Sequence, residues 1–117
     1  MANILIIDDD ETMRSTCAAV LTHAAHQVST ADNGFKGMEC VRAKPPQLIL
    51  MDIVMRYGGL PTLRVLRDQF PQIRVIVMSG TEKARLEIAG GLGASRIIAK
   101  PFSAEQLVTL VNEVLAG

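Results

Sequence analysis

Four short runs of aliphatic residues, none of which alternates with polar residues, constrain the fold of this chain more than any other feature. The runs cover residues 4–7, 48–51, 75–78 and 97–99. A strand with one face in solvent alternates apolar and polar residues, so unbroken apolar runs of this length are typical of strands buried on both faces. Such strands belong mainly to parallel sheets, whose crossover helices lie on the two faces. A weaker run at residues 27–31 predicts a fifth strand with one more solvated face.

Apolar residues recur with helical spacing between these runs and predict three helices in the first two-thirds of the chain. The predicted inward residues are Met13, Cys17, Val20 and Leu21 in the first, Phe35, Met38 and Val41 in the second, and Leu63, Leu66 and Phe70 in the third. Asp10 is the predicted N-cap of the first helix. Pro45 and Pro46 end the second, and Pro61 is the predicted first residue of the third.

Two further predicted helices complete the alternation of strands and helices. Residues 82–89 predict a short helix that ends at Gly90 and Gly91. Ser103 and Gln106 have the spacing of a capping box. An apolar stripe follows at Leu107, Leu110, Val111 and Val114. The order predicts one α/β domain over residues 1–117, a doubly wound five-stranded parallel sheet with five helices.

Composition excludes several classes of protein. Apolar residues make up 49% of the chain and charged residues 21%, which is globular composition. The 12 basic and 12 acidic residues argue against a nucleic-acid binder held by bulk electrostatics. No apolar run approaches the roughly 20 residues of a membrane span, and no basic-then-apolar leader opens the chain, so the expected location is the cytoplasm. Cys17 and Cys40 have neither a disulfide nor a metal spacing and are expected to be reduced.

Polar groups of three kinds follow the predicted strands directly. They are the carboxylates of Asp8, Asp9, Asp10 and Asp52, the hydroxyl of Ser79 and the ammonium of Lys100. Ligands of open α/β sheets bind at the carboxyl ends of the strands, so we expect these groups to converge on one rim. A single aspartate after a strand is more often a helix cap, and this is our interpretation of Asp10.

Such a cluster favours a cation and phosphoryl chemistry. Neighbouring carboxylates repel one another, and without compensation at least one would hold a proton. An all-oxygen cluster suits Mg²⁺, which takes one or two carboxylates from a protein and keeps several waters. Lys100 and Ser79 then remain to bind an anion on the metal. Together these groups are the parts needed for phosphoryl transfer.

At these positions the chain resembles the receiver domains of two-component response regulators. The matching segments are residues 4–11, 48–55, 75–80 and 98–102, in the same order as in that family. Asp32, Asn33 and Gly34, followed later by Gly93 and Ala94, also match family positions. The resemblance covers nearly the whole chain and implies a flavodoxin-like fold with strand order 2-1-3-4-5.

The resemblance also implies roles for individual residues. It makes Asp52 the phosphoryl acceptor, and Asp8 and Asp9 the acidic pair that holds Mg²⁺ or Mn²⁺. Asp52 and the backbone carbonyl of Val54 would be further metal ligands. The donor would be a phosphohistidine on a sensor histidine kinase or phosphotransfer protein. The domain would not be an enzyme beyond assisting its own phosphorylation and dephosphorylation.

On the same resemblance, Ser79 follows the phosphoryl group and Lys100 pairs with it. The output surface, through which such domains also dimerise, would comprise the helix at residues 82–89, the strand at 97–99 and the helix after Ser103. Its partner would be a downstream protein, with no direct partner expected among membranes or nucleic acids.

Several positions depart from the family pattern. Arg56 stands where proline is usual, and the loop after Asp52 is one residue short. Gly80 replaces the usual alanine, and Ile97 occupies the place of the switch aromatic. Because isoleucine cannot swing a ring, we expect any switching to pass through the backbone of residues 79–81.

Other interpretations stay open from the sequence alone. Residues 8–12 fit the Asp-x-Asp-x-Thr motif of haloacid-dehalogenase phosphatases, with Asp8 as nucleophile and Ser79 and Lys100 in the next two motifs. That family also needs a later acidic pair, which is missing, and it leaves Asp52 without a role. A receiver-like module that is not phosphorylated is the other alternative, against which the full acidic set argues. We expect His23 and His26 to be exposed, and Arg64, Arg67 and Arg74 to form a solvated face.

Overall fold

All five predicted strands form, each within one residue of its predicted bounds. The computed structural model describes residues 2–56, 59–82 and 93–117. The strands are β1 (Asn3–Ile7), β2 (Gln27–Ala31), β3 (Leu48–Asp52), β4 (Arg74–Ser79) and β5 (Arg96–Ala99). They make one parallel sheet in the order β2-β1-β3-β4-β5, which confirms the expected flavodoxin-like topology. Three of the five residues of β2 are exposed, as expected for the weaker run.

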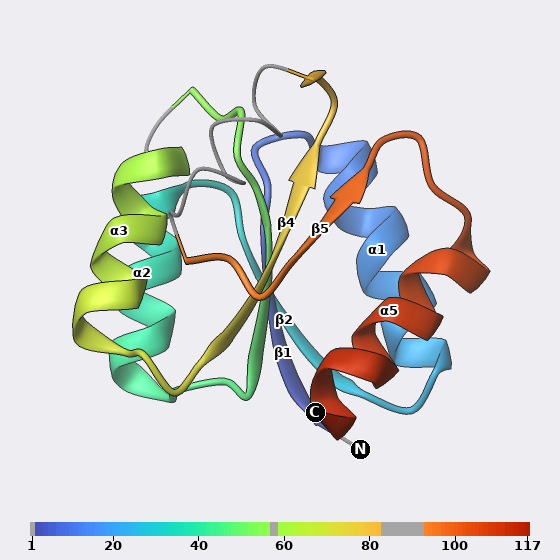
Figure 1. Cartoon of the computed structure of the whole chain (residues 1–117), viewed down its shortest axis with the longest axis horizontal. Coiled ribbons are helices and arrows are strands. Elements are labelled where there is room, and N and C mark those ends of the chain that lie inside the picture. Colours follow the sequence, from blue (N-terminus) through green and yellow to red (C-terminus); the bar gives the residue numbers. More distant parts are fainter. Residues whose placement is uncertain (1, 57–58, 83–92) are drawn as a thin grey trace.

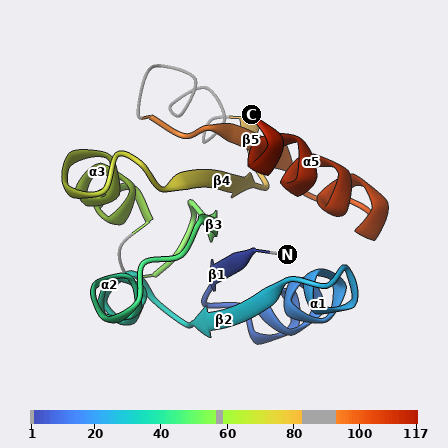
Figure 2. The same ribbon diagram turned by 90° about the horizontal axis from the view of Figure 1, so that it is seen from below.

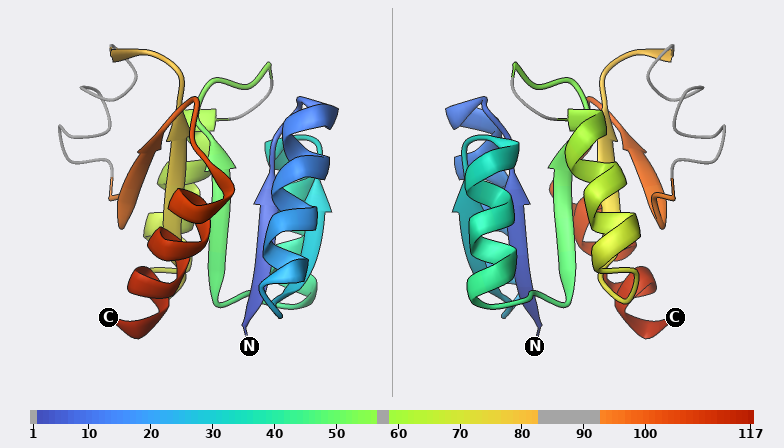
Figure 3. Two further views of the ribbon diagram at one scale, coloured as in Figure 1. Left: turned by 90° about the vertical axis from the view of Figure 1, so that its right-hand side faces the viewer. Right: turned by 90° about the vertical axis from the view of Figure 1, so that its left-hand side faces the viewer.

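Helices cover both faces of the sheet. Within the described residues they are α1 (Glu11–His23), α2 (Gly34–Ala43), α3 (Gly59–Gln69) and α5 (Ala104–Ala116). α1 and α5 lie on one face, and α2 and α3 lie on the other (Figure 1 and Figure 3). Figure 2 shows the sheet as the middle of three layers. Four helices are thus described against five predicted, because the helix expected at residues 82–89 falls, beyond Glu82, outside the described ranges.

The aliphatic runs are unbroken because the central strands are buried on both sides. Alternate residues of a strand point to opposite faces. Ile4, Ile6, Leu48, Leu50, Ile76 and Met78 belong to the core under α1 and α5, and Leu5, Ile7, Ile49, Met51, Val75 and Val77 to the core under α2 and α3. Each of these side chains is at most 1% exposed. Burying one such side chain contributes roughly 1.5–3 kcal/mol, so both cores stabilise the sheet.

The predicted helix caps are present. The side chain of Asp10 accepts hydrogen bonds from the backbone amides of Thr12 at 3.0 Å and Met13 at 3.5 Å, which confirms its structural role. Ser103 and Gln106 form a reciprocal capping box at the start of α5. In the predicted stripe on α5, Leu107, Val111 and Val114 are buried and Leu110 is half-buried.

The predicted inward face of α2 is partly wrong. Met38 and Val41 are buried, but Phe35 is 76% exposed. Gly34 and Gly37 occupy the inward positions instead. A Cβ atom on Gly37 would lie 2.5 Å from Cδ1 of Ile7, so glycine lets the helix approach β1 closely. This close approach fixes the rotation of α2 and turns Phe35 outward.

The third helix is longer than predicted. α3 begins at Gly59 rather than at Pro61. Leu63 and Leu66 are buried as predicted, and Phe70, which follows the helix, is half-buried against the same core. No helix in the described ranges has both the length and the apolar character needed to cross a membrane.

Some predictions about polar side chains are wrong. His26 is buried, and its Nδ1 accepts a hydrogen bond from the backbone N–H of Ala2 at 3.2 Å. Arg67 and Arg74 are half-buried and donate to backbone carbonyls, Arg67 to that of Ile73. Long side chains of this kind cover apolar surface with their methylene groups while the charged end finds an acceptor. His23 and Arg64 are exposed, as predicted.

Both cysteines are free, as predicted. Cys17 is buried in the core under α1, with its Sγ 3.7 Å from Sδ of Met13. Burial, with a smaller effect of the negative charge of Asp8, raises the pKa of Cys17 to about 11. The thiol therefore stays protonated at neutral pH and acts as a small core residue.

Candidate functional site

The predicted acidic cluster forms at the carboxyl ends of the strands. Asp8 directly follows β1, and Asp52 is the last residue of β3, the strand beside β1. One carboxylate oxygen each from Asp8, Asp9 and Asp52 can be chosen so that all three lie within 4.8 Å of one another. Asp8 is fully buried and Asp52 is 6% exposed, whereas Asp9 is exposed. The structure therefore brings together the three carboxylates that the sequence predicts as metal ligands.

Each of these carboxylates accepts one hydrogen bond from a backbone amide. The donors are Asp10 N to Asp8 Oδ1 at 2.9 Å, Val54 N to Asp52 Oδ1 at 3.0 Å, and Arg56 N to Asp9 Oδ2 at 3.0 Å. A hydrogen bond from a peptide amide favours the ionised carboxylate and restricts its rotation. The three side chains are thus held in place by the loops that follow β1 and β3.

Lys100 is the cation of the rim. Its Nζ lies 2.9 Å from Oδ2 of Asp52 and 3.8 Å from Oδ2 of Asp8. Its side chain is 21% exposed, so this ammonium is only partly hydrated. In the part of the chain that the structure describes, Oδ2 of Asp8 is buried and has no hydrogen-bond partner. Among the described residues, the Lys100 ammonium is therefore shared by two buried carboxylates, and Oδ2 of Asp8 is left without a hydrogen bond.

The pKa shifts reflect this imbalance. Burial raises the pKa of Asp8, the amide of Asp10 lowers it in part, and the negative charge of Asp52 raises it further. Burial alone would lower the pKa of Lys100, but the hydrogen bond to Asp52 and the charges of Asp52 and Asp8 raise it overall. Lys100 therefore stays charged, while the ionised form of Asp8 is disfavoured until a further cation approaches.

Ser79 lies on the same rim but is engaged elsewhere. It is the last residue of β4 and is 1% exposed. Its hydroxyl donates a hydrogen bond to the carbonyl oxygen of Thr81 at 2.8 Å. To contact an anion bound at Asp52, this hydroxyl must give up the bond to Thr81.

Comparison with known proteins assigns the chain to a family. Residues 4–112 match the model of the response regulator receiver domain. The chain belongs to this family. It is therefore a receiver domain of the two-component type, and the general function of such domains is to accept a phosphoryl group. This result confirms the resemblance seen in the four sequence segments.

Several relatives cover most or all of this receiver domain. Protein PilH of Pseudomonas aeruginosa is 36% identical over 121 residues, with the whole of both chains covered. Response regulator MprA of Mycobacterium leprae is 28% identical, and the alignment spans 96% of this chain but only 50% of that protein. The crystal structure of the receiver domain of NtrX from Brucella abortus is 27% identical, covers 97% of this chain and 98% of its own, and superposes with a TM-score of 0.88. The domain thus spans the full length of one relative and about half of another.

The donor set of the cluster fits a magnesium ion. Among the described residues, three carboxylates lie near the single ammonium of Lys100, the ligand atoms of the cluster are oxygens, and the buried Oδ2 of Asp8 has no hydrogen-bond partner. Hard divalent cations prefer such oxygen sites. Zinc, by contrast, favours nitrogen and sulfur ligands in tetrahedral sites. The cluster of this receiver domain could therefore hold a metal of the Mg²⁺ type.

Two other predicted site positions lie beside the cluster. The amide of Val54 contacts Asp52, and the Val54 side chain is 61% exposed; the role of its carbonyl as a metal ligand stays a prediction. Ile97 pairs with Val77 of β4 and packs, half-buried, against the core under α2 and α3. It fills space there as an ordinary core residue. Of the predicted output surface, β5 and α5 are described, whereas the helix expected at residues 82–89 lies, beyond Glu82, outside the described residues.

The contact between the Arg56 amide and Asp9 was not predicted from the sequence. A backbone donor leaves no trace in the type of its own side chain, so composition and motifs cannot reveal it. The one available signal is negative, because proline, which the resemblance places at this position, has no N–H to donate. The hydrogen bond from Nη1 of Arg14 to the backbone carbonyl of Asp8 at 2.8 Å was also not predicted, because nothing in the sequence marks that carbonyl as its acceptor.

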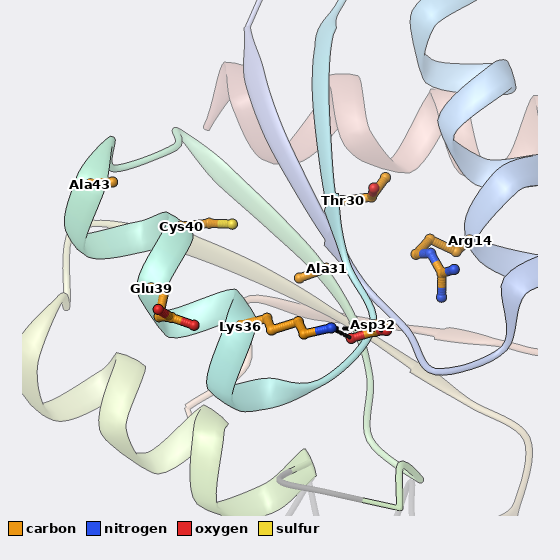
Figure 4. Close-up of a pocket in the computed structure, with 8 residues that line it drawn as sticks. All are labelled: Arg14, Thr30, Ala31, Asp32, Lys36, Glu39, Cys40 and Ala43. Atoms are coloured by element: carbon orange, nitrogen blue, oxygen red, sulfur yellow. Dashed lines mark hydrogen bonds and ion pairs between the residues drawn. The ribbon is translucent and has the colours of Figure 1, made fainter.

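A pocket away from the cluster lies between α2 and the end of β2 (Figure 4). Lys36 and Asp32 line it and form an exposed ion pair with Nζ 3.2 Å from Oδ1. Exposed pairs of this kind contribute little free energy, about 0–1 kcal/mol. The lining therefore offers no group comparable with the buried carboxylates and Lys100 at the rim.

Proposed function

We propose that Asp52 of this receiver domain accepts a phosphoryl group from a phosphohistidine on a sensor histidine kinase or phosphotransfer protein, in a reaction that depends on Mg²⁺. One observation carries the proposal: Asp52 lies at the end of the central strand, within reach of both Lys100 at 2.9 Å and the carboxylates of Asp8 and Asp9. Asp8 shares the burial and the acidic neighbours, but its Oδ2 lies 3.8 Å from the ammonium of Lys100, compared with 2.9 Å for Oδ2 of Asp52.

The chemistry is a transfer from nitrogen to oxygen. A carboxylate oxygen of Asp52 forms a bond to phosphorus, and the bond between phosphorus and the donor imidazole nitrogen breaks. The electron pair of that bond stays on the imidazole, and the product on Asp52 is an acyl phosphate. A bound Mg²⁺ supplies positive charge for the equatorial phosphoryl oxygens. The chain contributes position rather than activation, because an ionised carboxylate is already a nucleophile.

The surrounding residues have complementary tasks in this proposal. Asp8, Asp9, Asp52 and the carbonyl of Val54 would hold the metal. Lys100 would exchange its contact with Oδ2 of Asp52 for one with a phosphoryl oxygen, since its charge suits either anion.

Further parts of the proposal concern output and setting. The hydroxyl of Ser79 would leave Thr81 for a phosphoryl oxygen, and that movement would start the response of the domain. The result would be altered contact with a downstream protein, or between two copies through the surface that comprises residues 82–89, β5 and α5. The domain would turn over only its own phosphoryl group, so it is not an enzyme for other substrates, and the cytoplasm is the setting that fits such a partner kinase.

The haloacid-dehalogenase interpretation has no support beyond its motif. It needs Asp10 as an acid beside the nucleophile, but Asp10 caps α1 through the amides of Thr12 and Met13. It also gives no role to Asp52, which the structure places in the cluster.

The test is incubation with acetyl phosphate and Mg²⁺ followed by intact mass. The wild-type chain should gain about 80 Da, the mass of one phosphoryl group. Asp52→Asn should gain none, and Asp68→Asn, which changes an exposed aspartate on α3, should behave as the wild type. A full adduct on Asp52→Asn would overturn the assignment.

A further inference from the structure

The three hydrogen bonds that backbone amides donate to the acidic cluster are not equivalent. Asp8 and Asp52 each accept from a residue two positions further along the chain. These are local turns, and they form wherever the following loop adopts the right conformation. The hydrogen bond from the Arg56 amide to Asp9 instead links residues 47 positions apart and joins the loop after β3 to the loop after β1. It is a tertiary contact made by a backbone atom.

Asp9 is also the carboxylate that most needs such a contact. Asp8 and Asp52 are at most 6% exposed, so packing restricts their side chains. Asp9 is exposed, so packing restricts its rotamer least. A ligand free to rotate loses more conformational entropy when a cation binds. Hydrogen bonds to ligating carboxylates remove this freedom before binding.

The loop that carries Arg56 is fixed at its base. The amide of Ile53 donates to the carbonyl of Met78 on β4 at 3.2 Å. Gly59 begins α3 directly against the carbonyl of Ile53, where an added Cβ would lie 1.9 Å from the oxygen. Residues 53–56 are therefore anchored to the sheet at Ile53, and the hydrogen bond from the Arg56 amide to Asp9 ties them to the loop after β1.

We propose that the backbone amide of Arg56 is a positioning group for the metal ligand Asp9, and that it couples cation binding at the cluster to the conformation of residues 53–56, which follow β3. This rests on the proposed function, because it takes the cluster to be a magnesium site. A cation that fixes Asp9 also favours the bond to Arg56. By linkage, an intact bond strengthens cation binding by the same factor.

The hydrogen bond from the Arg56 amide to Asp9 is a feature of this chain rather than of receiver domains at large. The resemblance places proline where Arg56 stands, and proline has no N–H. A chain with proline there must hold its second acidic ligand by other means. The departure that looks like a surface substitution thus adds a donor to the site.

Two substitutions at one position separate the amide from the side chain. Arg56→Ala and Arg56→Pro both remove the guanidinium and its charge, but only proline removes the N–H. Mg²⁺ affinity is measured by calorimetry on the full chain. Arg56→Ala should bind Mg²⁺ as tightly as the wild type or more tightly, since a positive charge near the cluster is lost. Arg56→Pro should bind at least about tenfold more weakly than Arg56→Ala, the scale found for groups that support metal ligands.

A second pair of measurements controls for the fixed φ angle that proline introduces at residue 56. An ester bond in place of the amide at residue 56, made with the hydroxy-acid analogue of alanine, removes the N–H without restricting φ. It should match Arg56→Pro rather than Arg56→Ala. By NMR, the Arg56 amide should be protected from hydrogen exchange in the wild type and in Asp10→Ala, and should lose protection in Asp9→Ala.

The outcomes separate this proposal from the proposed function. Equal Mg²⁺ affinity for Arg56→Ala, Arg56→Pro and the ester would overturn the positioning role and leave the proposed function intact. A loss as large in Arg56→Ala as in Arg56→Pro would assign the effect to the side chain and would also overturn it. Failure of the wild type to bind Mg²⁺ at all would overturn both.

Discussion

At the scale of single residues, three neighbouring aspartates have three different roles that follow from their surroundings. Asp8 is buried beneath Lys100, Asp9 is exposed and held by a loop, and Asp10 caps α1. The first two belong to the candidate metal site, whereas the third satisfies backbone amides that the helix itself leaves unpaired. Binding and stability should therefore respond to different members of one short segment.

Substituting the second and third aspartates should separate these effects. Asp9→Ala should weaken Mg²⁺ binding at least about tenfold, the scale of a 1.4 kcal/mol loss, with little change in the free energy of unfolding without metal. Asp10→Ala should lower the free energy of unfolding by about 1 kcal/mol, as the loss of an N-cap does, with little change in Mg²⁺ affinity. Calorimetry and urea titration of both variants measure the two quantities. Equal losses of affinity would mean that the two residues share the metal site.

The buried Asp8 should make the metal-free domain less stable as the pH rises. Its pKa is raised in the folded state, mainly by burial, so the folded chain binds more protons than the unfolded chain between the usual value of 3.8 and the raised value. Stability is then lost as the pH rises through that window. Asp8→Asn, which cannot ionise, should gain stability relative to the wild type as the pH rises above the usual carboxyl value of 3.8, in urea titrations with EDTA.

Added Mg²⁺ should reverse this order, because a cation favours the ionised form of Asp8. At pH 7 the ion should stabilise the wild type more than Asp8→Asn. A constant difference between the two proteins at all pH values, with and without Mg²⁺, would show that Asp8 is not the titrating group.

At the scale of helices and strands, the sequence was most informative where burial was complete. Aliphatic runs predicted β1, β3, β4 and β5 within one residue, because two-sided burial leaves an unbroken apolar signal, and a weaker run predicted the more exposed β2. The caps at Asp10 and Ser103 were predictable because their chemistry is local. The rotation of α2 could not be predicted in this way. The two glycines on its inward face carry no apolar signal, and the apolar side chain of Phe35 wrongly indicated an inward position.

The close approach of α2 to β1 can be tested by filling it. Gly37→Ala places a methyl group 2.5 Å from Cδ1 of the buried Ile7, and crowding of this kind typically costs about 1–3 kcal/mol. Part of that cost is offset by the better helix propensity of alanine, up to about 1 kcal/mol. We therefore expect a net loss of about 1 kcal/mol in the free energy of unfolding.

Two further variants identify the cause of that loss. In the background of Ile7→Val, which lacks the crowded Cδ1, Gly37→Ala should no longer be destabilising. Phe35→Ala should change stability by less than about 0.5 kcal/mol, as exposed positions do. A large loss in Phe35→Ala, or no coupling between residues 7 and 37, would contradict the described rotation of α2.

At the scale of the whole molecule, parallel strands bring the predicted polar site residues to the carboxyl-end edge of the sheet. Asp8, Asp52, Ser79 and Lys100 come from four different strand ends, and the strand order alone makes neighbours of them. This is why the cluster could be predicted from residues far apart in the sequence. Contacts between loops, such as that of the Arg56 amide with Asp9, depend on backbone paths that no motif records.

The response to phosphorylation should begin at Ser79 and leave Ile97 in place. The Ser79 hydroxyl donates a hydrogen bond to the Thr81 carbonyl at 2.8 Å, and an acyl phosphate on Asp52 offers a stronger, charged acceptor. Moving the hydroxyl breaks its hydrogen bond to the Thr81 carbonyl, so the backbone of residues 79–81 should change. Among the described residues, no atom lies within 4 Å of where a Cβ of Gly80 would be, so packing there does not oppose a change of the Gly80 backbone. Ile97 packs against the core and has few rotamers, so its side chain should keep its position.

Beryllofluoride, a mimic of the phosphoryl group, allows the response to be measured by NMR. With Mg²⁺ and beryllofluoride, the amides of Ser79, Gly80 and Thr81 should shift, while the methyl signals of Ile97 should report a single unchanged rotamer. Ser79→Ala is the matched control, because it keeps Asp52 but has no hydroxyl that can change its hydrogen-bond acceptor. In this variant the amide signal of Thr81 should shift far less. A shift at Thr81 that persists in Ser79→Ala, or a change of rotamer at Ile97, would show that the signal leaves Asp52 by another path.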